Sequence, residues 1–110
     1  MKVLITGGAG YIGSTVASAC EDAGHDVVIL DDFSTGRREF IGERPLYEGD
    51  IADDSLLDRL FGEQRIDAVV HCAAKIIVPE SVSEPLAYYE NNVAKTVTLL
   101  AALQRNGVER

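Results

Sequence analysis

The sequence holds few residues of the kinds that bind metals or form disulfides. Its 110 residues include two cysteines, two histidines, one methionine and no tryptophan. Cys20 and Cys72 form no Cys-x-x-Cys pair, which argues against a zinc site and against a disulfide framework. Two histidines, His25 and His71, do not suggest a metal cluster, so no metal is expected.

Positive charge is also scarce. Ten lysine and arginine residues against eighteen aspartate and glutamate residues give a formal net charge of −8 and a sequence pI near 4.6. Nucleic-acid-binding domains usually carry a basic face, so nucleic acid is not expected as a partner. Anionic ligands stay open, because backbone N–H groups at a helix N-terminus bind phosphate without charged side chains.

Long apolar runs are absent. No stretch approaches the roughly 20 apolar residues of a membrane-spanning helix, so no membrane association is expected. The apolar start, residues 1–6, ends at a glycine pair and is shorter than the apolar region of a signal peptide. We therefore expect a cytoplasmic protein.

Short apolar runs alternate with helical patterns along the whole chain. Runs that end at turn residues predict strands over residues 2–6, 27–30, 46–48 and 68–71. Apolar residues at every third or fourth position predict helices over residues 12–23, 53–61 and 85–103. The expected loops are residues 32–44, with a helical turn near Phe40, and residues 75–84.

This alternation predicts an α/β fold in which helices cover both faces of a parallel sheet. The arrangement is the Rossmann-type doubly wound sheet, of which four strands make about the first half, with the first strand beside the fourth. With nothing after Arg110, the strand at 68–71 would be an open edge. The chain is therefore expected to be one incomplete domain, residues 1–110, of a larger protein.

A glycine-rich turn joins the first predicted strand to the first predicted helix. Gly7, Gly10 and Gly13 follow the pattern Gly-x-x-Gly-x-x-Gly. Glycines here let the chain turn tightly, approach a pyrophosphate through the backbone and pack the helix on the strand. A pyrophosphate would meet free N–H groups at the positive end of the helix dipole. The pattern predicts a dinucleotide site, and the alternative is a glycine turn without a ligand.

Acidic residues follow the next two predicted strands. Asp31 stands 18 residues after Gly13, where an acidic side chain accepts hydrogen bonds from the adenosine ribose hydroxyls. A carboxylate there repels a 2′-phosphate and favours NAD over NADP, although Arg37-Arg38 keeps NADP open. The pair Asp50-Ile51 is placed to accept from the adenine amino group and to pack on its ring. A turn-forming role is the alternative for both aspartates.

The fourth predicted strand ends in small residues. His71 is expected to be a packed, hydrogen-bonded histidine rather than a base, and Cys72 a small buried residue rather than a nucleophile. Ala73 and Ala74 would let a cofactor approach the backbone. No catalytic set is found, since no tyrosine is followed four positions later by lysine.

With these motifs the sequence resembles the extended short-chain dehydrogenase/reductase family, and within it the enzymes that epimerise sugar nucleotides at C4. The resemblance is carried by residues 2–14, 24–32, 48–51, 80–82 and 85–93. It covers nearly the whole chain but only about the first third of such an enzyme. One departure is that Lys75 stands one position earlier than the lysine of the family pattern.

The resemblance implies NAD as the cofactor and assigns residues to it. Tyr11 and Ile12 would lie at the pyrophosphate, and Asn91 would reach the cofactor from the long helix. The segment 31–36 would surround the adenosine ribose, and the segment 72–76 would line the central part of the cofactor. Motifs and resemblance together give as cofactor-binding residues Gly7, Gly10, Tyr11, Ile12, Gly13, Asp31, Asp32, Phe33, Ser34, Thr35, Gly36, Asp50, Ile51, Cys72, Ala73, Ala74, Lys75, Ile76 and Asn91.

The implied reaction is epimerisation at C4 of UDP-glucose and UDP-galactose, with transient hydride transfer to NAD⁺. The tyrosine and lysine that the family uses have no counterpart here, so this chain alone is not expected to turn over. A UDP-sugar would bind mostly outside it, and the family suggests a homodimer through helices that include residues 85–103. The alternatives are another nucleotide-sugar dehydratase or epimerase, a non-catalytic NAD-binding module, and a fragment without a ligand.

Overall fold

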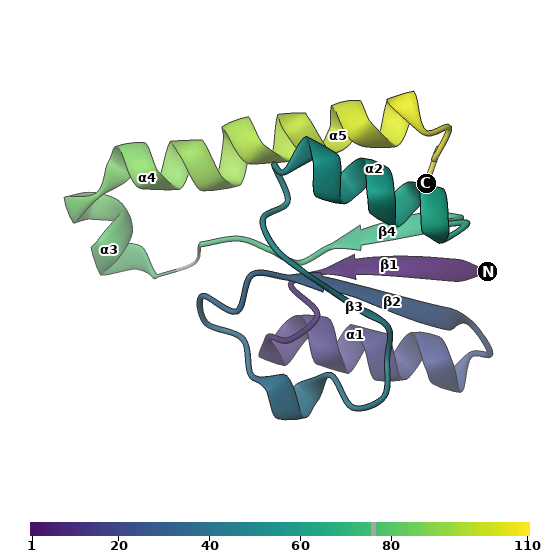
Figure 1. Cartoon of the computed structure of the whole chain (residues 1–110). Helices are drawn as coiled ribbons and strands as arrows, with labels where there is room; N and C mark the ends of the chain where they lie inside the picture. The colour runs from purple at the N-terminus through teal and green to yellow at the C-terminus, as the bar shows by residue number, and fades with distance from the viewer. Residues whose placement is uncertain (76) are drawn as a thin grey trace.

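The computed structural model describes residues 1–75 and 77–110 (Figure 1). Its strands form one four-stranded parallel sheet in the order β3-β2-β1-β4. The strands are β1 (Lys2–Thr6), β2 (Asp26–Asp31), β3 (Leu46–Glu48) and β4 (Ala68–His71). The predicted strands, and the placement of the first beside the fourth, are confirmed.

Helices cover both faces of the sheet. Helix α1 (Tyr11–Asp22) lies on one face, and α2 (Asp54–Glu63) and α5 (Lys95–Arg105) lie on the other (Figure 1). Along β1 the side chains alternate, so that Val3 and Ile5 join the cluster under α1, whereas Leu4 joins the cluster under α2 and α5. Because both faces are covered, both sets of strand side chains are apolar.

Local sequence signals set the helix ends. Asp53 is the N-cap of α2, and its carboxylate accepts a hydrogen bond from the Leu56 N–H at 3.2 Å, as the sequence predicts. After α1, Gly24 adopts a φ of +88°, in the left-handed region that favours glycine. The N–H of His25 then binds the Cys20 carbonyl at 3.0 Å, which satisfies a carbonyl at the helix end.

The expectation of a loop over residues 75–84 is wrong. These residues include helix α3 (Val78–Ser83), which is too short to show an apolar period. Pro79 occupies its first turn, where a missing N–H costs no hydrogen bond. The helical turn expected near Phe40 is confirmed as the 3-10 turn η1 (Arg38–Phe40).

The long helix predicted from Pro85 is confirmed, but it contains a π turn that its apolar pattern does not predict. Helix α4 (Pro85–Tyr89) continues through the π turn η2 (Glu90–Ala94) into α5. The edge strand β4 is not fully open, because the Val69 N–H donates to the Arg110 carbonyl at 2.9 Å. Within residues 1–75 and 77–110, no helix has the length and apolarity needed to cross a membrane.

Candidate functional site

The carboxyl ends of all four strands meet at one edge of the sheet. The register places Thr6, the last residue of β1, beside His71 of β4 and beside Leu30 of β2. Helices α3 and α4 extend past this edge (Figure 1). Open α/β sheets bind ligands at the carboxyl ends of their strands. The residues assigned above to a cofactor, as far as the structure describes them, lie at these strand ends, on the segments that follow them or on the long helix.

The glycine turn approaches its neighbours so closely that side chains are excluded. Gly7 has a φ of +71°, and a Cβ added to it would lie 2.8 Å from the Ala73 nitrogen. A Cβ on Gly13 would lie 2.1 Å from the Gly7 carbonyl oxygen. Gly10 is the N-cap of α1 and supplies no side-chain oxygen to cap it. The first N–H groups of α1 are therefore open to an external acceptor.

Side chains at the start of α1 leave this helix end accessible. Tyr11 is 77% exposed and Ile12 is 62% exposed, although both begin a helix whose opposite face is packed on the sheet. No acidic residue stands in the first turn of α1. An anion would therefore approach the helix dipole without charge repulsion from that turn.

Asp31 connects the glycine turn to the segment that follows β2. Its side chain is buried, with 8% exposed, and its Oδ2 accepts from the Ala9 N–H at 2.8 Å. Its Oδ1 accepts from the Phe33 N–H at 2.8 Å. The turn-forming role weighed for Asp31 is thus present in the structure. Each carboxylate oxygen keeps a second lone pair, so acceptance from ribose hydroxyls remains a prediction that this geometry allows.

The segment 32–36 lies against the glycine turn. The Asp32 carboxylate accepts from the Ser34 N–H at 2.9 Å, which closes a local turn and leaves Ser34 and Thr35 exposed. A Cβ on Gly36 would lie 2.6 Å from the Ala9 Cβ. The Arg37 N–H donates to the Ala9 carbonyl at 2.9 Å. Two predicted walls of the site therefore touch each other directly.

Phe33 and Arg38 form a second contact in this region that sequence reasoning missed. Phe33 has a φ of +59°, unusual for a bulky side chain. The Arg38 guanidinium carbon lies 4.3 Å from the Phe33 ring centroid, and Arg38 Nη2 lies 2.6 Å from Glu48 Oε1. Arg37 pairs more loosely with Glu39, at 3.9 Å. Arg37 and Arg38, the two arginines for which NADP was considered as the cofactor, are therefore both paired with glutamates.

Asp50 is engaged by Lys95 of α5, another residue that sequence reasoning missed. Asp50 Oδ1 accepts from the Ala52 N–H at 2.8 Å, and Lys95 Nζ lies 2.5 Å from Oδ2. Burial would raise the pKa of Asp50, but the hydrogen bonds from Lys95 and Ala52 outweigh it and lower that pKa. The hydrogen bond to Asp50 raises the pKa of Lys95. Ile51 is 7% exposed and packs in the core, so its contact with adenine remains a prediction.

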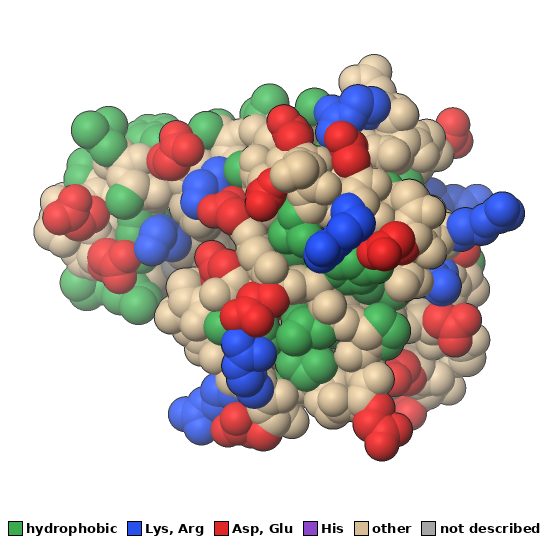
Figure 2. Space-filling view, viewed as in Figure 1, with side chains coloured by type: hydrophobic (Ala, Val, Ile, Leu, Met, Phe, Trp, Pro, Cys, Tyr) green, Lys and Arg blue, Asp and Glu red, His purple; other side chains and the backbone are tan. Residues whose placement is uncertain are grey.

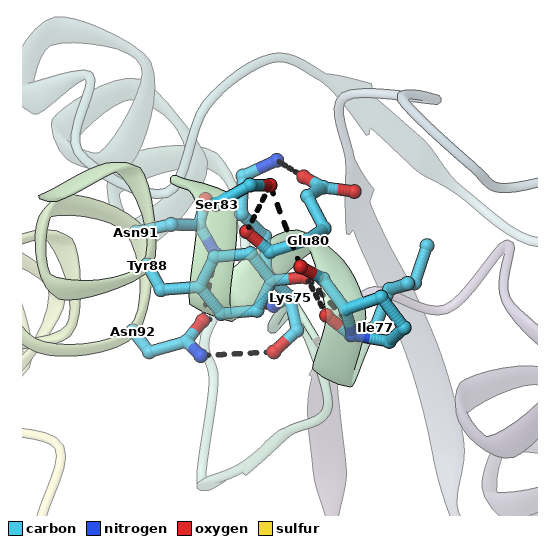
Figure 3. A network of polar contacts seen from close by, with 8 residues as sticks. Lys75, Ile77, Glu80, Ser83, Tyr88, Asn91 and Asn92 are labelled. Atoms are coloured by element: carbon cyan, nitrogen blue, oxygen red, sulfur yellow. Dashed lines mark hydrogen bonds and ion pairs between the residues drawn. The ribbon is translucent and has the colours of Figure 1, made fainter. Parts of the chain in front are cut away.

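Polar side chains of the long helix hold the segment after β4 (Figure 3). The Lys75 N–H donates to Asn92 Oδ1 at 2.8 Å, and Asn92 Nδ2 donates to the Lys75 carbonyl at 2.9 Å. Asn91 donates to Asn92 Oδ1 at 3.0 Å. The family resemblance implies Asn91 as the helix residue that reaches the cofactor, and the structure adds Asn92, which binds the Lys75 backbone.

The same segment has further ties to α3 and α4. Lys75 Nζ lies 3.4 Å from Glu80 Oε1, and the Tyr88 hydroxyl binds both the N–H and the carbonyl of Ile77, at 3.0 and 2.8 Å (Figure 3). The displaced lysine is thus held in an ion pair within this chain. Ile76, predicted to line the cofactor, lies outside the described residues.

Neither His71 nor Cys72 has the environment of a reactive group. Partial burial lowers the pKa of His71, which favours the neutral ring. Partial burial raises the pKa of the Cys72 thiol, which disfavours the thiolate. Both ring nitrogens of His71 are hydrogen-bonded, as expected, although the residue is exposed rather than part of the core.

A cavity of about 790 Å³ lies elsewhere, between α1 and the segment 39–45. None of the residues assigned to the cofactor lines it. The face shown in Figure 2 carries acidic and basic side chains interspersed, with hydrophobic side chains gathered over α3 and α4. The candidate site is therefore not this cavity but the end of the sheet at which the carboxyl ends of the strands lie.

A parallel sheet with a glycine turn at the start of its first helix, and an acidic residue at the end of its second strand, is the arrangement of the N-terminal half of a Rossmann-type fold, a class whose members bind dinucleotides at this turn. Comparison with known proteins agrees with this class. The chain belongs to the NAD dependent epimerase/dehydratase family, whose sequence pattern matches residues 3–110.

Several relatives are UDP-glucose 4-epimerases. The chain is 54% identical over 110 residues to the enzyme of Azospirillum brasilense, covering 99% of this chain and 32% of that protein. It is 43% identical over 111 residues to the enzyme of Lacticaseibacillus casei, covering 100% of this chain and 34% of that protein. The chain therefore spans about a third of the length of these relatives.

Solved structures show the same fold. The chain matches the Thermus thermophilus UDP-glucose 4-epimerase in complex with NAD with a TM-score of 0.94 and 38% identity, covering 99% of this chain and 35% of that one. It matches the Bifidobacterium longum enzyme in complex with NAD⁺ and UDP with a TM-score of 0.94 and 32% identity, again covering 99% and 35%.

Proposed function

We propose that this chain is the NAD-binding part of a UDP-glucose 4-epimerase. The observation that carries the proposal is the cradle formed by Gly7, Gly13 and the uncapped start of α1, beside the buried carboxylate of Asp31. A Cβ on either glycine would collide with the backbone packed against the turn, at Ala73 or at Gly7, and the donors at the start of α1 are backbone N–H groups suited to an anion. The relatives described above include structures with bound NAD.

Each part of the cradle has a distinct task. The first N–H groups of α1 bind the pyrophosphate, and the remaining lone pairs of Asp31 accept from the adenosine ribose hydroxyls. The loop after β4, held by Asn92, forms the opposite wall. When bound, NAD⁺ supplies a hydride acceptor for the carbon at which the sugar is epimerised. The residues of this chain bind and orient it.

The substrate assignment, a UDP-sugar inverted at C4, rests on the relatives, since the chain covers about a third of their length. Another nucleotide-sugar dehydratase or epimerase would use the same cofactor half. The sequence of this chain contains no Tyr-x-x-x-Lys pair, an observation that also favours a non-catalytic NAD-binding module. We expect the chain alone to bind NAD⁺ and not to turn over UDP-galactose.

A calorimetric titration of the purified chain with NAD⁺, with NADP⁺ as the comparison, tests the proposal. We expect saturable binding of NAD⁺ and much weaker binding of NADP⁺. A chain that unfolds cooperatively on heating but binds neither dinucleotide would contradict the assignment. Turnover of UDP-galactose by a mass-verified sample would contradict the expectation that the chain alone is inactive.

A further inference from the structure

A chain of hydrogen bonds connects β1, β4 and the long helix behind the proposed site. Thr6 is fully buried, and its Oγ1 accepts from the N–H groups of Cys72 and Ala73 at 3.2 and 3.3 Å. The same Oγ1 lies 2.5 Å from His71 Nδ1. On the other side of the ring, His71 Nε2 lies 3.2 Å from Thr96 Oγ1.

The donors and acceptors in this row of hydrogen bonds indicate the direction in which each proton is donated. The Thr96 hydroxyl donates to the Asn92 carbonyl at 3.0 Å, so Thr96 Oγ1 accepts from His71 Nε2. At the other end, Thr6 Oγ1 accepts from the Ala73 N–H and shares the Cys72 N–H with the Thr6 carbonyl, which Cys72 binds at 3.0 Å, so its hydroxyl proton is directed at His71 Nδ1. Nδ1 then carries no proton, and Nε2 carries it.

The residues at the two ends of this row of hydrogen bonds, Thr6 and Asn92, hold the two ends of the segment 72–75. Thr6 binds the backbone at residues 72 and 73, and Asn92 binds both the N–H and the carbonyl of Lys75 (Figure 3). Asn92 lies in the π turn η2, and the Thr96 hydroxyl donates to the Asn92 backbone carbonyl. Turns of this kind are frequent at functional sites.

We propose that His71, as its neutral Nε2–H tautomer, is a positioning residue: together with Thr96 it fixes the segment 72–75 against the glycine turn. The inference rests on the proposed NAD site, of which this segment is one wall. The segment is close enough to matter, since a Cβ on Gly7 would lie 2.8 Å from the Ala73 nitrogen. A shift of the segment would therefore change the width of the cradle directly.

The tautomer is measured without any ligand. Long-range ¹H–¹⁵N spectra of the chain at neutral pH distinguish a protonated ring nitrogen from an unprotonated one. The only other histidine signal, that of His25, is identified by the variant His25→Gln. We expect Nε2 of His71 to be protonated and Nδ1 to be free. A His71 ring protonated at Nδ1, or at both nitrogens, would overturn the proposed direction of the hydrogen bonds from Thr6 through His71 to Thr96.

The positioning effect is measured with a matched pair of variants on one helix. Thr96→Val removes the hydroxyl that links His71 to Asn92. Thr98→Val removes a hydroxyl whose one hydrogen bond within the described part of the chain is to the Ala94 carbonyl, at 3.3 Å. We expect amide hydrogen exchange at Ala73 and Lys75 to become about three- to tenfold faster in Thr96→Val and unchanged in Thr98→Val. Thr96→Ser should restore slow exchange.

Equal exchange in both valine variants would overturn the proposal. Binding of NAD⁺ is a separate readout, expected to weaken about three- to tenfold in Thr96→Val relative to Thr98→Val. If the unaltered chain does not bind NAD⁺, the proposed function fails, while the tautomer and the exchange rates still decide the role of His71. If exchange changes but NAD⁺ affinity does not, the role of His71 in holding the segment stands, and the inference that the position of this segment sets the width of the NAD⁺ cradle is overturned.

Discussion

Asp31 at the end of β2 binds the backbone N–H of Ala9 through Oδ2 at 2.8 Å, and so fixes the glycine turn to a neighbouring strand. Its other oxygen binds the Phe33 N–H. A single buried carboxylate therefore shapes two walls of the site before any ligand binds. The same carboxylate is the predicted acceptor for ribose, so its removal should have two separable effects.

The variant Asp31→Ala is expected to weaken NAD⁺ binding at least about tenfold, since hydrogen bonds to charged groups contribute about 1.5–3 kcal/mol. It should also lower the free energy of unfolding by about 1–3 kcal/mol, because backbone N–H groups lose their partner. Calorimetry and urea unfolding measure the two effects. Asp26→Ala, at the exposed opposite end of β2, is the charge-matched control. An unchanged dissociation constant would contradict the ribose assignment.

The glycine turn offers a comparison between two alanine substitutions in helices. Gly13→Ala would place a Cβ 2.1 Å from the Gly7 carbonyl oxygen, whereas a Cβ on Gly62 in α2 meets nothing within 4 Å. We expect Gly13→Ala to destabilise the chain by about 1–3 kcal/mol and to abolish NAD⁺ binding. Gly62→Ala should be neutral or stabilise by up to about 1 kcal/mol.

Urea midpoints of the two variants, with NAD⁺ titrations, decide the point. Equal stability of the Gly13 and Gly62 variants would show that α1 can move away from the glycine turn, contrary to the close packing described here.

The ion pair of Lys95 with Asp50 predicts a pH-dependent contribution to stability. The pKa of Asp50 is held below its ordinary value of 3.8, so the contribution is complete above that pH and is lost as the pH falls below it. The variant Lys95→Met should destabilise the chain at pH 7 by about 0.2–1 kcal/mol, the range of exposed ion pairs. The difference from the unaltered chain should shrink in acid.

Urea unfolding at neutral and acidic pH measures this difference. In the Asp50→Asn background, Lys95→Met should have little effect at either pH, which provides the control. A stability difference that stayed constant from neutral pH to well below 3.8 would show that Lys95 acts through packing and not through the Asp50 charge.

The pairing of Arg38 with Glu48 predicts how the site discriminates between dinucleotides. In Glu48→Gln the guanidinium over the Phe33 ring loses its charged partner and becomes available to a 2′-phosphate. We expect the affinity for NADP⁺ relative to NAD⁺ to rise about three- to tenfold. Parallel titrations measure the ratio, and Glu43→Gln removes the same charge from the preceding loop as a control. A ratio unchanged in Glu48→Gln would exclude Arg38 from the discrimination.

Exposed apolar residues on the long helix predict self-association. The α4–α5 stripe, defined as Leu86, Tyr89, Val93, Val97 and Leu100, is 54–81% exposed and recurs at helical spacing. Monomeric proteins rarely expose a contiguous stripe of this kind. We expect the chain to form a homodimer through the stripe, and lysine at positions 97 and 100 to weaken it. Sedimentation equilibrium measures this, with Val82→Lys on α3 as the control. Equal association of the variant with lysine at positions 97 and 100 and of the Val82→Lys control would place the dimer contact outside the stripe.

The order of strands and helices and the glycine turn could be predicted from the sequence alone. These features depend on neighbouring residues: apolar periodicity, a cap such as Asp53, and the left-handed φ that Gly24 adopts. The sequence did not reveal α3, which is too short for a period. It did not reveal the π turn either, because Tyr89, Val93 and Val97 keep a four-residue spacing that is also typical of an uninterrupted α-helix.

The polar groups that meet at the edge of the sheet could be identified only from the folded chain. Lys95 reaches Asp50 across 45 positions of sequence, and Thr6 reaches His71 across 65. Asn92 binds the Lys75 backbone, whereas its neighbour Asn91 donates to the Asn92 side chain. Such contacts depend on strand order and helix rotation, which arise from packing both faces of the sheet and leave no local signal in the chain.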